Sequence, residues 1–545
     1  MVSYPTPSSF KFNTFKGIRT RNGIAQGGTI SATECKNVDF VPSAYDAGVI
    51  IRSSYGNYPI CEYTGFKIIK GFEFKSENSV HLLFYCENDT YGKLVEFTGT
   101  VGNPFTDIID TYTDDNNDTQ HYFEVTGQAN GITMLDNAYN TFVFTNGLVY
   151  FAYCPDAESA DDVVKKLEPE YNSSPVTGLA LAEQDGSIVI GCNEGVVLAS
   201  RKGDITDFDY VTPEDTNKAW YQLFGKAVTA VVPYIDALLV FTEEDSTMLS
   251  GNMSDASSAT RADASLGGCM SFESWVKHDK YLFFYDNRQK NIYYYMQNDY
   301  GQKVLGEPIA PEVQVFFNKV SRLQMVSYIG NNRSEIWVLL DDKKLIYDYF
   351  MHEWAERDCQ TLTSYFVYDN NVYSTGGAKV LKEKAGNMGL FDGVYYPSVY
   401  KMQIINLGSY SNMKEMEFQP LLTVESNYNN TFALECLING KKTKTKYLEM
   451  FFQGAIWADN TAQTEETPES EVWAEDGEDE EDQNVIGQVF PDENDALIQQ
   501  LKGKFISNWY FLQFTIRTQS QGDSFSINCF ELKGITEEYD TVGVK

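Results

Sequence analysis

The sequence predicts an all-β protein: a β-propeller of about six to eight blades followed by a β-sandwich domain that carries an acidic insert. Short segments with β-branched and aromatic residues follow one another along the 545-residue chain, separated by Gly, Asn and Asp. Aromatic residues make up 14% of the chain, with 36 Tyr and 35 Phe, and such rings favour strands. Helical periodicity is scarce, and only residues 161–167 and 495–501 fit a short helix.

A strand–turn–strand couplet recurs along the first two thirds of the chain. The spacing between couplets is mostly about 40–60 residues, close to the length of a propeller blade. The repetition favours a propeller over a single sandwich and places it at residues 31–386, after an N-terminal arm at residues 1–30. The couplets lie at residues 81–97, 141–150, 187–200, 238–249, 281–295, 335–349 and 366–373.

Longer alternating strands appear after Gly386. They predict a β-sandwich in two halves, at residues 387–455 and 503–545. The halves are separated by an acidic, low-complexity insert at residues 456–502. Between residues 465 and 482, eleven of eighteen residues are Asp or Glu and none is basic. A block of like charge repels itself and stays loop-like unless a cationic partner neutralises it.

Two groups of residues are candidates for interfaces, because aromatic side chains contribute large areas to protein contacts. The N-terminal arm either reaches a neighbouring molecule or closes the propeller as its first strand. The insert is either a solvated loop or a docking segment. The candidates are Tyr4, Phe10, Phe12 and Phe15 in the arm, and Trp457, Trp473, Glu478, Asp479, Glu480, Glu481 and Asp482 in the insert.

The formal net charge of −35 excludes a protein that grips nucleic acid through its phosphates, which requires clustered Lys and Arg. The four histidines are not at metal-ligand spacing, and no Cys-x-x-Cys, His-Glu-x-x-His, Gly-x-Ser-x-Gly or phosphate-loop motif occurs. We therefore predict no catalytic residue, no cofactor and no metal.

Nine widely spaced cysteines indicate buried thiols in a reducing cytoplasm. No apolar run is long enough to predict a membrane span, and the N-terminus lacks a signal peptide.

Several segments, in this order, resemble the tail nozzle (tubular) or ring proteins of short-tailed bacteriophages, including crAss-like phages. In the third segment, Ser53 stands where the family has proline. The final one begins with Tyr-Asp-Tyr and ends at Trp354, which is expected to pack across the hairpin that the Tyr-Asp-Tyr strand begins. The segments are residues 15–18, 32–39, 48–56, 188–208, 227–243, 268–274 and 347–354.

The resemblance implies a structural subunit of the virion, assembled in the bacterial cytoplasm and without enzymatic activity. It would form a six-fold or twelve-fold ring of identical chains, bind other tail or portal-proximal ring proteins and fibres, and let DNA pass without specific binding. The acidic composition then serves either solubility or a channel wall that repels phosphate. The alternative is a receptor-binding or glycan-cleaving phage propeller, in which exposed Trp, Tyr and Asp side chains hold a sugar.

Overall fold

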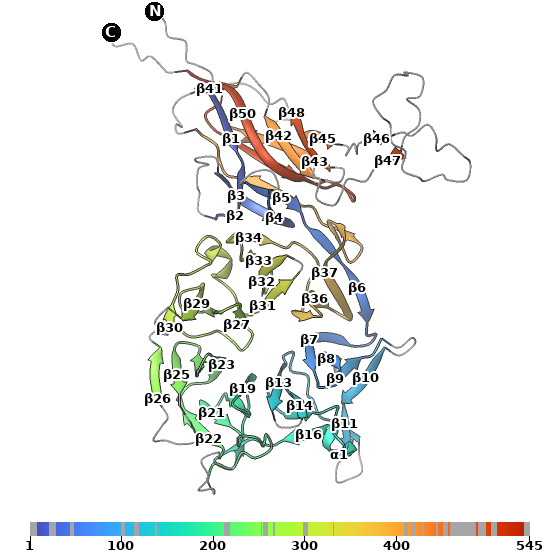
Figure 1. The fold of residues 1–545 in the computed structure, drawn as a ribbon, viewed down its shortest axis with the longest axis vertical. Helices are drawn as coiled ribbons and strands as arrows, with labels where there is room; N and C mark the ends of the chain where they lie inside the picture. Colours follow the sequence, from blue (N-terminus) through green and yellow to red (C-terminus); the bar gives the residue numbers. More distant parts are fainter. Residues whose placement is uncertain are drawn as a thin grey trace, which may run out of the picture.

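The computed structural model shows a nearly all-β chain whose propeller and second β domain lie end to end, and the first and last described strands both belong to the second domain (Figure 1). The structure describes residues 8–20, 29–43, 48–99, 104–113, 119–136, 139–211, 218–251, 253, 260–264, 267–297, 303–330, 332–407, 413–416, 420–426, 430–442, 445–450, 456–457, 487–488, 497–502 and 509–538. Within these ranges the helices are α1 (Ala160–Val163) and the 3-10 turn η1 (Gln314–Phe317).

The propeller consists of antiparallel meanders arranged around a common axis. Six of them stand as separate sheets, and a seventh, β31–β34, is also linked through β34 to the second domain. The strands, blade by blade, are β7 (Lys67–Lys75), β8 (Val80–Glu87), β9 (Gly92–Phe97), β10 (Phe105–Ile109); β13 (Asn130–Asp136), β14 (Tyr139–Thr145), β15 (Tyr150–Tyr153), β16 (Val164–Leu167); β19 (Ala180–Gln184), β20 (Ser187–Gly191), β21 (Val196–Ala199), β22 (Trp220–Leu223); β23 (Val228–Tyr234), β24 (Ala237–Thr242), β25 (Ser246–Ser250), β26 (Thr260–Ala264); β27 (Trp275–His278), β28 (Tyr281–Asp286), β29 (Asn291–Gln297), β30 (Lys303–Leu305); β31 (Leu323–Gly330), β32 (Arg333–Leu340), β33 (Lys344–Asp348), β34 (Glu353–Glu356); and β35 (Ser364–Tyr368), β36 (Asn371–Gly376), β37 (Lys379–Met388), β6 (Tyr55–Glu62), with β38 (Leu390–Phe391) and β39 (Val394–Tyr395).

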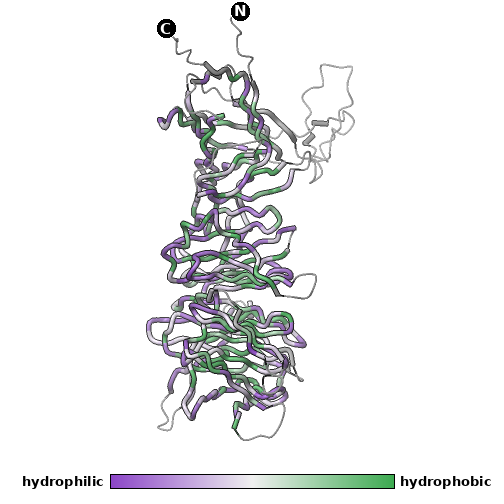
Figure 2. Tube along the Cα trace, turned by 90° about the vertical axis from the view of Figure 1, so that its left-hand side faces the viewer, coloured by the Kyte–Doolittle hydropathy of each residue, from purple (hydrophilic) through white to green (hydrophobic). Residues whose placement is uncertain are grey.

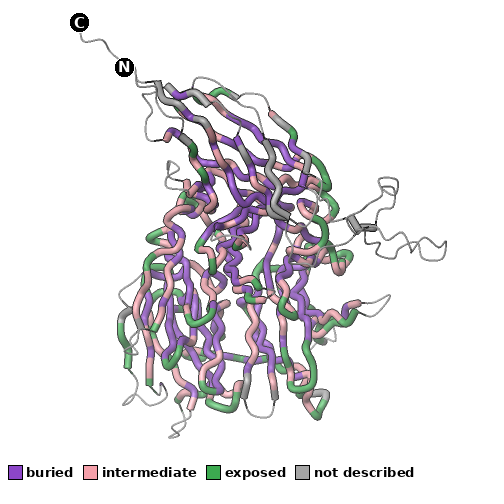
Figure 3. Tube along the Cα trace, turned by 45° about the horizontal axis from the view of Figure 1, so that its top comes forward, coloured by how far each residue is buried: buried purple, intermediate pink, exposed green. Residues whose placement is uncertain are grey.

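The propeller and the predicted range of blade numbers are confirmed. In the first six blades the predicted couplet is the second and third strand, for example β8 and β9, and in the last blade it is the first and second. The middle strands are buried on both faces, as in β20 and β24, because neighbouring blades pack against both sides of each sheet. Figure 3 shows buried strands whose turns are exposed.

A strand from the N-terminal part of the chain closes the propeller. The last blade takes its fourth strand from β6, which pairs antiparallel with β37. β6 follows directly after β5 (Val49–Ser53), a strand of the second domain. The circle of blades is therefore closed by hydrogen bonds between residues more than 300 positions apart in sequence. The strand that closes it, β6, is continuous with the second domain.

The second domain differs from the predicted C-terminal sandwich, which is not confirmed. Its strands pair into a closed barrel that mixes both ends of the chain: β1 pairs with β50, β3 with β40 and β5 with β50. The strands are β1 (Ser8–Phe12), β2 (Thr14–Ile18), β3 (Thr29–Lys36), β4 (Val38–Pro42), β5, β40 (Val399–Met402), β41 (Met413–Met416), β42 (Leu421–Ser426), β43 (Asn430–Ile438), β44 (Lys441–Lys442), β45 (Lys446–Met450), β48 (Leu497–Lys502), β49 (Leu512–Arg517) and β50 (Ser526–Glu538).

The predicted boundaries change accordingly. The strands β1 to β5, which lie in the segments assigned to an arm and to the start of the propeller, belong to the barrel. The last residues of the predicted insert form β48, paired with β42. The predicted helix at residues 161–167 is one turn, α1, followed by β16, because its second half pairs with β15. The segment 495–501, also predicted as a helix, is strand from Leu497 onward.

Short ladders complete the described structure: β11 (Thr111–Thr113) with β12 (Thr119–His121), β17 (Glu170–Tyr171) with β18 (Ser174–Pro175), and β46 (Ile456–Trp457) with β47 (Gly487–Gln488). From the side, the molecule is elongated, with the barrel stacked on the propeller and hydrophobic residues alternating with hydrophilic ones along the sheets (Figure 2).

No helix among the described residues is long and apolar enough to cross a membrane.

Candidate functional site at the propeller–barrel junction

The predicted N-terminal interface residues are core residues of the barrel. Phe12 is 3% exposed and stacks 6.4 Å from Phe530, and Phe15 is fully buried with its ring edge-on to Tyr400. Phe10 is partly buried against the same core. The prediction of an arm that reaches a neighbour is wrong for these three phenylalanines, as is the prediction of a first propeller strand. Phe10 and Phe12 lie in β1, which pairs with β50, and Phe15 lies in β2, which pairs with β3. Tyr4 lies outside the described residues.

The predicted insert residues are placed only in part. The backbone of Trp457 lies in β46, which pairs with β47 across the insert. Trp473, Glu478, Asp479, Glu480, Glu481 and Asp482 lie outside the described residues. Their predicted role at an interface therefore stays a prediction.

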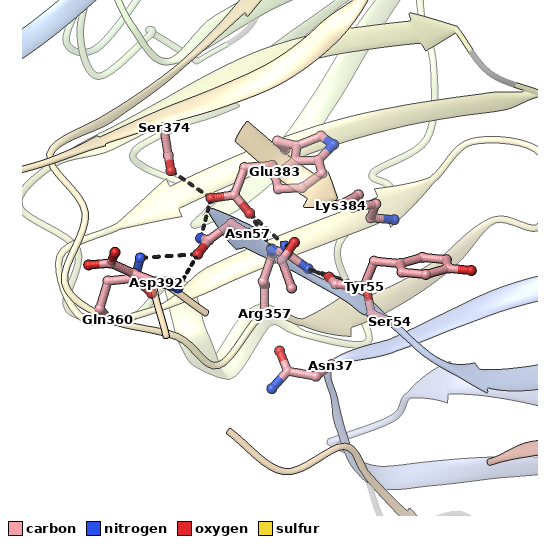
Figure 4. Close-up of polar contacts among 12 residues, drawn as sticks. Asn37, Ser54, Tyr55, Asn57, Arg357, Gln360, Ser374, Glu383, Lys384 and Asp392 are labelled. Atoms are coloured by element: carbon pink, nitrogen blue, oxygen red, sulfur yellow. Dashed lines mark hydrogen bonds and ion pairs between the residues drawn. The ribbon is translucent and has the colours of Figure 1, made fainter. Parts of the chain in front are cut away.

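A buried ion pair joins the barrel, the sixth blade and the seventh blade (Figure 4). Arg357, directly after β34, donates from Nε to Glu383 Oε2 at 2.7 Å, and their side chains are 1% and 0% exposed. The same guanidinium donates to the backbone carbonyls of Tyr55 and Gly56, at 3.1 Å each. Arg357 thus holds the segment where β5 of the barrel continues into β6 of the propeller.

The Glu383 carboxylate, the partner of Arg357, accepts further hydrogen bonds. Glu383 also accepts hydrogen bonds from Asn57 Nδ2 at 2.9 Å and from Ser374 Oγ at 2.6 Å. A buried charge is tolerated only when it is paired and hydrogen-bonded, and both members of this pair meet that condition. The junction therefore has a single well-defined geometry.

A second charged cluster lies beside this pair, across a cleft of about 440 Å³ between barrel strands β4 and β5 and propeller strands β32 and β33. The Asp39 carboxylate accepts from Arg333 Nη1 at 3.1 Å and from Lys384 Nζ at 2.9 Å. Burial alone would raise the pKa of Asp39, but Arg333, Lys384 and Arg52 together hold it well below its usual range. Lys384 also contacts Glu335 of β32, so barrel and propeller are joined by a charge network.

A third cluster crosses the inside of the propeller. Lys70 of the first blade donates to Glu273 Oε1 at 2.8 Å, although Glu273 precedes the fifth blade. Arg322 and Gln324, at the start of the sixth blade, donate to the same carboxylate. The first blade is a neighbour of neither the fifth nor the sixth, so the cluster links blades that lie apart in the propeller.

We expect Glu273→Gln to lower the free energy of unfolding by about 1.5–3 kcal/mol at pH 7, because Lys70 and Arg322 lose the buried negative charge to which they donate. Burial raises the pKa of Glu273, but Lys70 and Arg322 outweigh it and the net shift is downward. A carboxyl with a lowered folded-state pKa stabilises above its unfolded pKa, about 4.3, and loses this as pH falls through the folded value. The advantage of the wild type over the variant should therefore shrink below pH 4.3 in urea titrations. An equal gap at pH 7 and pH 3, or an equal loss in the exposed control Glu244→Gln, would refute it.

The histidines and cysteines have structural surroundings. His278 is buried between Ser327 and Ser334 of the sixth blade, at 2.8 and 2.7 Å, and His81 contacts Glu96 at 2.7 Å. All nine cysteines are free thiols, eight of them buried. Across the described ranges, no group of three or more His, Cys, Asp or Glu side chains is arranged to hold a metal ion. The polar groups at the described clusters hold blades and domains together.

Comparison with known proteins adds little beyond the fold. No protein-family model matches the chain, and no curated protein matches its sequence. Among solved structures, the chain is similar to BBS1N in complex with ARL6DN, soaked with mercury (13% identity, covering 61% of this chain and 96% of that one, TM-score 0.35) or with lead (12%, 62% and 98%, 0.36). It is also similar to the computationally designed Ika8 protein (12%, 68% and 98%, 0.31).

The sequence prediction missed the residues of the junction. Glu335 and Arg333 flank the apolar core of β32, and Glu383 and Lys384 lie in the alternating strand β37. Charged residues inside otherwise buried strands are a usable signal, since such residues are rarely buried unless paired. The signal indicates that partners exist, whereas Asp39 and Arg357 are identified only by the folded topology.

Proposed function

We propose that this protein is a structural subunit of a bacteriophage tail nozzle or connector ring, which forms or surrounds the channel through which DNA is ejected. The observation that carries the proposal is the junction: strand β5 continues into β6, and the Arg357–Glu383 pair fixes that crossing from two blades. A subunit that transmits force between stacked rings needs domains that do not hinge, and this junction meets that need.

The other parts of the proposal rest on the net charge of the chain and on how identical chains form a ring. In this proposal DNA passes through the centre of a ring of subunits and not through the axis of one propeller. A net charge of −35 suits a wall past which phosphates slide without binding. Identical chains that meet through heterologous, head-to-tail contacts form a ring when the rotation from one chain to the next divides a full turn evenly. Other tail or portal-proximal ring proteins and fibres would bind above and below, in the virion.

Native mass spectrometry of the purified chain, alone and mixed with its neighbouring tail proteins, tests the proposal. We expect a species of six or twelve times the 61.7 kDa of one chain. A chain that stays monomeric under both conditions, at micromolar concentration, would contradict the ring.

Deleting residues 465–482 tests the predicted docking role of the acidic insert. We expect the shortened chain to keep its melting temperature within about 2 °C, because a solvated loop of like charges adds no packed core. One assembly contact should weaken, seen as partial dissociation of the ring at a concentration where the wild type is intact. A deletion variant that does not fold would show that the insert is structural, and an unaffected ring would show that it is no docking segment.

The alternative, a receptor-binding or glycan-cleaving propeller, is favoured by one exposed aromatic cluster. The ring centroids of Tyr210 and Tyr221, at the third blade, lie 4.8 Å apart, and Tyr171 of β17 packs against Tyr221. Tyr221 is 38% exposed, and Val211, next to Tyr210, is 79% exposed. Aromatic side chains with a polar tip suit a surface that is half apolar and half wet. If Tyr221→Ala abolishes binding to, or cleavage of, host polysaccharide by an otherwise stable protein, this alternative replaces the ring.

A further inference from the structure

One arginine in the cleft between barrel and propeller has no partner. Arg52 of β5 lies directly across from Asp39 of β4 in the strand register and lines the cleft. Its Nε is buried and makes no hydrogen bond. No hydrogen bond or ion pair joins its guanidinium to another side chain in the part of the chain that the structure describes; it interacts with Asp39 only through its electric field.

The carboxylates that line the cleft accept hydrogen bonds from groups other than Arg52. Both Asp39 oxygens are occupied, one by Arg333 and one by Lys384. Glu353 accepts from the Gly17 amide at 2.8 Å and pairs with Arg19 at 3.0 Å. Asp348 accepts the amides of the turn that follows it, those of Phe350 and Met351.

Glu335 contacts Lys384 through Oε1 and accepts from Trp337 Nε1 through Oε2 at 2.9 Å. The four carboxylates of the cleft are thereby engaged by other groups. Arg52 is the one cation of the cleft without a hydrogen-bonded anion among the described residues. Because Nε is buried, the two Nη groups supply the N–H donors that remain available for an added anion.

The other residues that line the cleft determine which kind of anion fits beside Arg52. Apolar side chains form one wall, and Phe350 at the edge is 64% exposed. The four carboxylates around the cavity oppose an anion of high charge density such as phosphate, since like charges at short range repel strongly at low dielectric. A single carboxylate attached to an apolar group satisfies both the guanidinium and the wall. The apolar lining residues are Val38, Phe40, Val41, Pro42, Ile346, Phe350, Met351 and Ala355.

We propose that this cleft binds a peptide carboxylate with an apolar residue beside it, held by the Arg52 guanidinium, with the apolar side chain against Val41, Ile346 and Phe350. The carboxylate comes either from a chain end or from an acidic side chain. This site does not depend on ring formation, because the cleft lies within one chain.

Isothermal titration calorimetry on the full-length chain tests the site with three short peptides. N-acetyl-Leu-Phe with a free C-terminus carries a terminal carboxylate, N-acetyl-Asp-Phe-amide carries a side-chain carboxylate, and N-acetyl-Leu-Phe-amide carries neither. We expect at least one of the two acids to bind at least about tenfold more tightly than the neutral peptide. Which acid binds identifies the source of the carboxylate. If the neutral peptide binds as tightly as both acids, or if no peptide binds, the proposal is wrong.

Variants of the protein locate the binding. Arg52→Gln should lower the affinity for the acid about tenfold or more, and Phe350→Ala should lower it for both acid and neutral peptides. The matched control Arg261→Gln, on β26 far along the chain from the cleft, should bind like the wild type. Since the Arg52 side chain makes no hydrogen bond to another described residue, Arg52→Gln should melt near the wild-type temperature. Unchanged binding in a folded Arg52→Gln variant, or equal competition by inorganic phosphate, would overturn the assignment.

Discussion

Replacing Glu383 with alanine is expected to lower the free energy of unfolding by about 3–5 kcal/mol, because it leaves the buried Arg357 guanidinium without its counter-charge. Arg357 is 1% exposed, so no solvent replaces the lost carboxylate. Asn57 Nδ2 and Ser374 Oγ also lose their acceptor. Equilibrium urea unfolding, followed by tryptophan fluorescence, measures the change.

The exposed pair between Lys226 and Glu244 supplies the matched control. Its side chains are 51% and 62% exposed, so Glu244→Ala should cost less than about 1 kcal/mol. Glu383→Gln should fall between the two alanine variants, since an amide keeps part of the hydrogen bonding without the charge. If Glu383→Ala and Glu244→Ala unfold at the same urea concentration, the buried pair does not fix the junction.

Trp354→Ala is expected to cost about 3–5 kcal/mol, the usual cost of emptying a large buried aromatic site. Trp354 is 1% exposed and lies opposite Tyr347 in the β33–β34 register, with ring centroids 4.9 Å apart. Its Nε1 donates to the carbonyl of Ile309 at 2.9 Å, which the variant leaves unpaired. Thermal unfolding by circular dichroism should show a lower midpoint.

Two further variants make this test specific. Trp354→Phe keeps most of the ring packing but not the hydrogen bond, so its midpoint should lie between those of wild type and Trp354→Ala. Phe350, four residues earlier in the same turn, is 64% exposed, so its alanine variant should change the free energy of unfolding by no more than about 0.5 kcal/mol. An equal effect of Phe350→Ala and Trp354→Ala would contradict the packing described for the turn.

The propeller was predictable because its signal is local and repeated. Each couplet, such as residues 187–200, alternates apolar strands with a tight turn, and the same unit returns about once per blade. The packing of Trp354 across its hairpin was predictable for the same reason, because Tyr347 and Trp354 are separated by one turn.

The barrel and the junction were not predictable in this way, because their partners are distant in sequence. Phe12 meets Phe530, and Asp39 meets Lys384, through pairings that no local pattern encodes. The alternation of β1 shows that it is a strand but not which strand it joins. The N-terminal aromatics were therefore assigned to an arm, although the folded chain uses them as barrel core.

Electron microscopy of the assembled protein tests the central claim most directly. The ring proposal predicts class averages with six-fold or twelve-fold symmetry and an open centre, formed by the chain alone or with an adjacent tail protein. Each subunit should appear as one rigid body with propeller and barrel in a constant relation. Compact trimers, or particles whose two domains vary in relative orientation, would contradict the account.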